Sequence, residues 1–71
     1  MSEFLFIIPA GWTKISTNAI EQIGSSIGDW LQVNDYNSLS EALIAQNEIA
    51  PDMRVWEAKF FNGEVLAVRI G

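Results

Sequence analysis

Residues 53–71 read MRVWEAKFFNGEVLAVRIG, and this stretch decides the fold. Asn62-Gly63 stands between two runs rich in aromatic and β-branched residues, which is the strongest short-range signal of a β-hairpin. Both central positions of such a turn need a positive φ. A two-residue turn pairs Phe61 with Glu64 and fixes the register of both strands outward from that pair. The chain is therefore expected to contain a C-terminal antiparallel hairpin.

The predicted register leaves apolar side chains on both faces of the hairpin. One face carries Trp56, Ala58, Phe60, Val65 and Ala67, and the other carries Val55, Phe61, Leu66, Val68 and Ile70. A strand with one wet face should instead alternate apolar and polar residues. The same register sets Trp56 opposite Arg69, where the pair would either form a cation–π contact or close the end of the sheet.

The apolar run FLFII at residues 4–8 predicts a further strand, closed by the turn residues Pro9, Ala10 and Gly11. A secretion signal would need a basic segment first, whereas the charged residue before this run is Glu3. A membrane-spanning helix needs about 20 apolar residues. The chain is therefore expected to be made and to fold in a cytoplasm.

Two helices are expected between this strand and the hairpin. Asn18 and Glu21 supply the capping chemistry of the first helix, which runs to about Gln32. Its buried stripe consists of apolar residues spaced three and four apart: Ile20, Ile23, Ile27, Trp30 and Leu31. Gly24 and Gly28 lie beside that stripe. They indicate either the close approach of another backbone or a poorly optimised helix.

The second helix is expected to start at the S-x-x-E capping box of Ser38 and Glu41. It ends before Pro51, because the residue that precedes a proline is disfavoured in helical geometry. Its predicted buried side consists of Leu39, Ala42, Leu43, Gln46 and Ile49. Residues 1–71 thus predict one α+β domain of order β-α-α-β-β, with a three-stranded, mainly antiparallel sheet.

Composition argues against several classes of function. The chain has no Cys and no His, so disulfides, zinc sites and histidine-based catalysis are not expected, and neither is a cofactor. Its charge is −5, and its cations are scattered at Lys14, Arg54, Lys59 and Arg69. Nucleic-acid binding needs a basic stripe instead. We therefore expect no enzyme activity and no nucleic-acid, membrane or small-molecule partner.

Two helices can cover only one face of the predicted sheet, so the other face should be a protein interface. Such a face exposes on the order of several hundred Å², about the largest apolar patch that a soluble monomer tolerates. The alternative is that the helices straddle the sheet, or that Trp12 folds back over it. The candidate interface residues were chosen for aromatic area and hot-spot chemistry: Trp56, Phe60, Val65, Trp12 and Arg69.

The segments MSEFLFIIPAGW and EAKFFNGEVLAVRIG resemble small structural proteins of tailed bacteriophages, in particular short tail-associated proteins of phages that infect actinobacteria. The resemblance implies a non-enzymatic virion component, with a minor tail protein more expected than a head protein. Its partners would be other virion subunits or further copies of itself. The alternative function is that of a small phage or bacterial protein that binds and inhibits one host protein.

Overall fold

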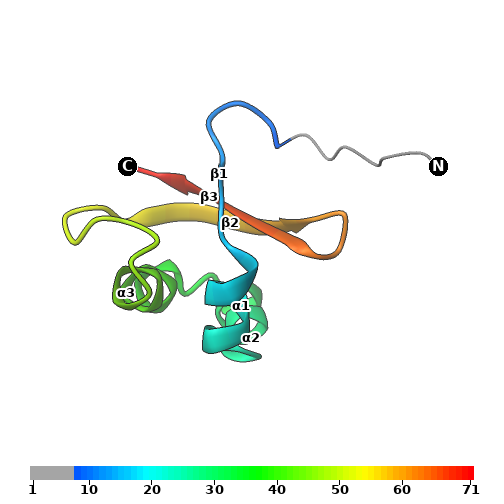
Figure 1. Ribbon diagram of the computed structural model, residues 1–71, viewed down its shortest axis with the longest axis horizontal. Helices are drawn as coiled ribbons and strands as arrows, with labels where there is room; N and C mark the ends of the chain where they lie inside the picture. The colour runs from blue at the N-terminus through cyan, green and yellow to red at the C-terminus, as the bar shows by residue number, and fades with distance from the viewer. Residues whose placement is uncertain (1–7) are drawn as a thin grey trace.

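The computed structural model describes residues 8–71, which form one small α+β domain. The elements are β1 (Thr13–Lys14), α1 (Thr17–Ile23), α2 (Ser26–Val33), α3 (Tyr36–Ala45), β2 (Val55–Phe61) and β3 (Val65–Ile70). The strands form one antiparallel sheet of order β1-β3-β2. All three helices lie on one side of this sheet (Figure 1). The predicted fold class is confirmed, with three helices where two were expected.

The strand that completes the sheet differs from the predicted one. Residues 4–7 of the predicted strand lie outside the described residues, and Ile8 belongs to no strand. The sheet is completed by β1, in which Thr13 pairs with Val68 and Lys14 pairs with Ala67. Among the strands of residues 8–71, β3 is therefore the central one, and β1 and β2 lie at the edges.

The predicted first helix is two helices, because the chain turns at Gly24. This glycine has a φ of 74°, a conformation that an α-helix cannot contain, and its N–H donates to the carbonyl of Ile20 at 2.9 Å. A β-carbon added at Gly24 or Gly28 would meet no neighbouring atom within 4 Å. The interpretation that these glycines admit another backbone is therefore wrong, and Gly24 acts as the cap of α1.

The helices also begin at other residues than the capping patterns predict. Ser16, and not Asn18, caps α1, since its hydroxyl accepts a hydrogen bond from the backbone N–H of Ala19 at 3.1 Å. Asp35 caps α3, where its carboxylate accepts from the backbone N–H of Ser38 at 3.1 Å and from the Ser38 hydroxyl at 2.8 Å. Ser38 is thus a partner of the cap, inside the first turn of α3.

The hairpin turns at Asn62-Gly63 as predicted, with φ values of 54° and 76°. Its register is one residue away from the predicted one, because Phe61 pairs with Val65. Glu64 belongs to the connection, and its N–H donates to the carbonyl of Phe61 at 3.1 Å. A shift of one residue moves side chains to the opposite face of a sheet, so the predicted faces are wrong.

A β-bulge then leaves Trp56 unpaired in the ladder. On one side of it Val55 pairs with Ile70, as predicted, and on the other side Glu57 pairs with Arg69. Trp56 therefore shares no face with Ala58, which is buried in the core. A bulge adds one residue to one strand, and here it cancels the shift that the longer connection introduced.

The two faces of the hairpin differ clearly in chemistry. The side toward the helices carries Val55, Ala58, Phe60, Leu66, Val68 and Ile70. The side away from the helices, called the outer face below, carries Glu57, Lys59, Phe61, Val65, Ala67 and Arg69. The expectation of two apolar faces is therefore wrong, and the helices do not straddle the sheet. The core lies between helices and sheet, around Ile15, Ile27, Leu39, Leu43, Leu66 and Val68.

Gly63→Val is expected to destabilise the domain by about 1–3 kcal/mol, because a β-branched residue is strained at a positive φ. Thermal unfolding followed by tryptophan fluorescence measures the loss. Asn62→Gly is the matched control and should change stability little, since glycine adopts a φ of 54° readily. Equal stability of Gly63→Val and the wild-type protein would contradict the hairpin turn described above.

Candidate protein interface

An arginine on the outer face lies close to two tryptophans. The guanidinium carbon of Arg69 lies 5.0 Å from the centroid of the Trp12 ring and 5.1 Å from that of the Trp56 ring. Both distances fall within the range of cation–π attraction, about 6 Å. Of the two roles considered for Trp56 and Arg69, the cation–π contact is observed, and Trp56 makes it from the bulge. Trp56 remains 55% exposed.

Two further side chains extend this group along the sheet. The rings of Trp12 and Phe61 meet edge to face, with centroids 5.2 Å apart and planes at 80°. The ammonium nitrogen of Lys59 lies 4.9 Å from the centroid of Phe61 and 5.9 Å from that of Trp12. We call these five residues, Trp12, Trp56, Phe61, Lys59 and Arg69, the aromatic–cation cluster.

Glu57 lies beside the cluster and helps to orient Arg69. Nε of Arg69 is 3.4 Å from Oε1 of Glu57, within ion-pair range but without the alignment of a hydrogen bond. Both side chains are partly exposed, so this ion pair contributes at most about 1 kcal/mol to stability. Its effect is to hold the guanidinium in one place between the two rings.

The structure brings together three of the five predicted interface residues, namely Trp12, Trp56 and Arg69. Val65 also lies on the outer face, since it pairs with Phe61. Phe60 does not belong to this face, because it pairs with Leu66 on the side toward the helices, where it is 36% exposed. The register shift is the cause, because it exchanges the faces of neighbouring strand residues.

Sequence reasoning missed Lys59 and Phe61 as members of the cluster. They are two residues apart on β2, so they share a face in any register. That spacing was the available signal. The predicted register, however, assigned Phe61 to a face without Trp56 or Arg69, so the two residues were not connected with them.

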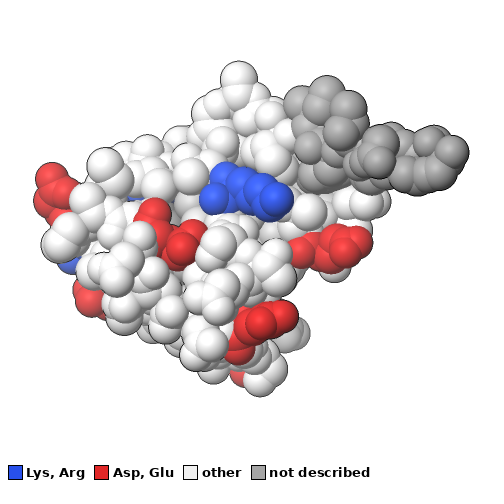
Figure 2. Space-filling view, viewed as in Figure 1, with Lys and Arg blue, Asp and Glu red and all other residues white. Residues whose placement is uncertain are grey.

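Opposite charges gather on the two sides of the sheet. Three of the four cations belong to the outer face, because Lys14 and Lys59 both pair with Ala67 and Arg69 lies two residues further along β3. Residues 17–45, which contain the helices, include no Lys or Arg and four acidic residues. Figure 2 shows a basic area at the level of the sheet, with separate acidic areas beside it and below it.

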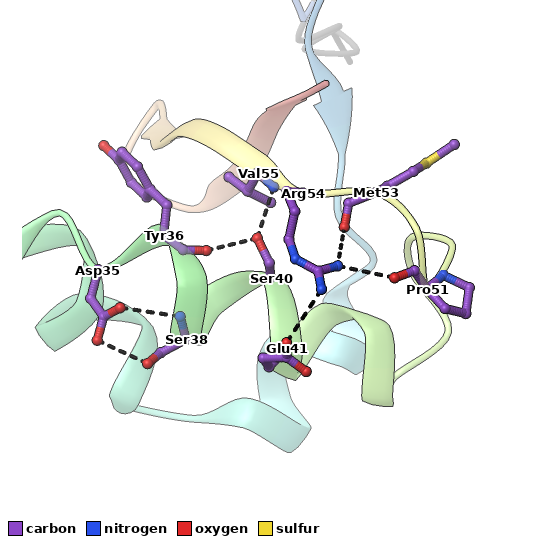
Figure 3. A network of polar contacts seen from close by, with 9 residues as sticks. All are labelled: Asp35, Tyr36, Ser38, Ser40, Glu41, Pro51, Met53, Arg54 and Val55. Carbon is purple, nitrogen blue, oxygen red and sulfur yellow. Dashed lines mark hydrogen bonds and ion pairs between the residues drawn. The ribbon is translucent and has the colours of Figure 1, made fainter.

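A polar network joins α3 to the start of β2 (Figure 3). The Ser40 hydroxyl donates to the carbonyl of Tyr36 at 2.7 Å and accepts from the backbone N–H of Val55 at 2.8 Å. Ser40 is fully buried. With no exposure and both hydrogen-bonding roles occupied, its hydroxyl links helix to strand and is not poised as a nucleophile.

Arg54 lies at the exposed end of the same network. Its guanidinium donates to the carbonyls of Pro51 and Met53 at 3.0 and 2.7 Å and lies 3.6 Å from the Glu41 carboxylate (Figure 3). These contacts fix the loop that leads into β2. Arg54 is therefore a structural cation, and it does not belong to the outer face.

A shallow, open groove lies between the loop after α3 and the sheet. It is lined by Thr13, Asn47, Glu48, Ile49, Ala50, Pro51, Met53 and Ile70. The Glu48 carboxylate accepts two hydrogen bonds from Ser16, one from its backbone N–H and one from its hydroxyl, each at 3.0 Å. This carboxylate thus joins the loop after α3 to the start of α1.

Within residues 8–71, no group of three or more acidic, His or Cys side chains is arranged to hold a metal ion. In the same part of the chain, no helix is both long and apolar enough to cross a bilayer. No family model matches the chain, and no curated protein or solved structure matches it.

Proposed function

We propose that this protein is a non-enzymatic assembly subunit that binds other protein subunits through the outer face of its sheet. The observation that carries the proposal is the exposed Trp56, stacked on Arg69 on the side of the sheet away from the helices. Tryptophan and arginine are the residue types most enriched at the energetic centres of protein interfaces. Because the two side chains already stack on each other, they lose less conformational entropy when a partner binds.

The aromatic–cation cluster supports this proposal more strongly than the apolar area that the helices leave uncovered. Five apolar strand residues, Val55, Ala58, Leu66, Ala67 and Val68, are already buried within the chain. The uncovered apolar surface is thus smaller than the sequence pattern predicts. The exposed members of the cluster are Trp56 and Lys59, and Arg69 is partly exposed. This mixed aromatic and cationic character suits a specific contact better than a general hydrophobic one.

The kind of assembly we propose is a bacteriophage virion, with a role as a minor tail component. The support is the resemblance of the segments MSEFLFIIPAGW and EAKFFNGEVLAVRIG to short tail-associated phage proteins. The cluster draws on both segments, since Trp12 ends the first and Lys59, Phe61 and Arg69 belong to the second. An interface that uses these residues would account for the presence of both segments in one subunit.

Quantitative mass spectrometry of purified particles tests this function. The protein is expected at a fixed number of copies per particle, and Trp56→Ala should reduce its incorporation at least tenfold, as expected for a residue at the energetic centre of an interface. Met53→Ala is the matched control, because Met53 is also an exposed large apolar residue but lies outside the outer face. Its incorporation should equal that of the wild type.

Absence of the protein from purified particles would contradict a virion role. A small protein that binds and inhibits one host protein through the same face would then be the better account. Equal incorporation of Trp56→Ala and Met53→Ala would instead show that another surface makes the contact.

A further inference from the structure

The helix layer, formed by α1, α2 and α3, carries exposed carboxylates and an exposed apolar side chain. Glu21 on α1 and Asp29 on α2 are exposed, and neither forms an ion pair with any of residues 8–71. Val33, which is 69% exposed, follows Asp29 by four residues on α2. Residues four apart lie on the same side of a helix. The helix layer therefore presents an apolar side chain beside a carboxylate.

The outer face presents the complementary pair of features. Its cations are Lys14, Lys59 and Arg69, set against the single acidic residue Glu57 on the two hairpin strands of this face. Trp56 supplies an exposed apolar surface beside them. The helices lie on the opposite side of the sheet (Figure 1), so the outer face and the helix layer are opposite sides of one molecule. They meet only when two molecules associate.

We infer that the partner on the outer face is the helix layer of a second copy of this chain. The inference rests on the proposed function and names the subunit that binds there. In this arrangement Lys14 and Lys59 of one copy lie near Glu21 and Asp29 of the next, and Trp56 packs near Val33. The contact uses two different surfaces, so a pair of copies keeps one free outer face and one free helix layer, and further copies stack head to tail.

Sedimentation of the full chain with two charge-reversed variants tests this arrangement. The sheet variant is Lys14→Glu with Lys59→Glu, and the helix variant is Glu21→Lys with Asp29→Lys. At low salt the wild type should self-associate, and each variant alone should associate at least tenfold more weakly, because like charges then face each other. Added salt should weaken wild-type association by screening the same charges.

An equimolar mixture of the two variants gives the decisive result. The acidic sheet face of one variant fits the basic helix layer of the other, so the mixture should associate although neither variant does so alone. Arg54→Glu is the matched control, since it removes a cation that lies outside the outer face. It should associate like the wild type. Circular dichroism of each variant checks that the fold is retained.

A folded wild type that stays monomeric at high micromolar concentration and low salt would overturn the inference. So would folded variants that fail to associate in the mixture. Either result leaves the proposed function standing if Trp56→Ala still prevents incorporation into particles, because a different protein would then occupy the outer face. Binding of a single-stranded oligonucleotide that is lost in the sheet variant would also overturn it, since stacking aromatics and cations bind such strands too.

Discussion

Replacing Leu43 by alanine is expected to destabilise the domain by about 2–5 kcal/mol, the usual cost of the lost burial and of the cavity left behind. Leu43 lies on α3, is fully buried, and belongs to one core with Leu39, Val55 and Leu66. A domain has a total stability of roughly 0.05–0.15 kcal/mol per residue. For a chain of 71 residues this is roughly 4–11 kcal/mol, so the loss is a large share of the free energy of unfolding.

Urea unfolding followed by tryptophan fluorescence measures this effect. Leu43→Met is the matched control and should cost less than about 1.5 kcal/mol, because the volume of the side chain is preserved. Val33→Ala, at an exposed position on α2, should stay within about 0.5 kcal/mol of the wild type. If Leu43→Ala were as stable as Val33→Ala, Leu43 would not be in the core.

Replacing Ser40 by alanine is expected to cost about 1–3 kcal/mol, the penalty for a buried polar group that loses its partner. The substitution removes the acceptor of the Val55 N–H, which is buried between α3 and β2. The most specific readout is amide hydrogen exchange. The Val55 amide should lose protection, whereas the Gly71 amide, which donates to the carbonyl of Arg54, should change only as far as overall stability falls.

Ser38→Ala provides the comparison on the same helix. The Ser38 hydroxyl also donates a hydrogen bond, to the carboxylate of Asp35, but this bond is only partly buried and water can replace it. Its loss should therefore cost less than the loss of the Ser40 hydroxyl. Equal effects of the two substitutions, with unchanged exchange at Val55, would argue against the buried link between α3 and β2.

The fold class was predictable because its signals are local. Asn62-Gly63 marks the hairpin turn, and the spacing of apolar residues identifies the helical region and most of its core, including Leu39 and Leu43. The number of helices was harder to predict. A glycine does not reveal its φ in a sequence, so the turn at Gly24 could not be distinguished from a continuous helix that contains a glycine.

The register of the hairpin was not predictable in the same way. Asn62 and Gly63 adopt positive φ values as expected, but nothing in Glu64 itself decides whether it belongs to the strand or to the connection. The bulge at Trp56 depends on tertiary structure, because the backbone N–H of the neighbouring Val55 donates a hydrogen bond to the Ser40 hydroxyl on α3. A local pattern contains no information about that distant hydroxyl.

The candidate site was predictable in part for the same reason. Trp12, Trp56 and Arg69 were found from their residue types, which are common at interfaces whatever the register. Assigning Phe60 or Phe61 to the outer face depends on the register itself. A shift of one residue exchanges the two, so Phe60 was selected and Phe61 was missed.

The bulge at Trp56 also affects whether strands of other molecules can add to the edge of the sheet. An unbroken edge strand exposes a regular row of N–H and C=O groups that recruits strands from other molecules into amyloid-like stacks. On β2 that row is interrupted at Trp56, its first donor is already engaged by Ser40, and Lys59 adds a charge along it. Within residues 8–71, this edge therefore disfavours the addition of a strand from another molecule.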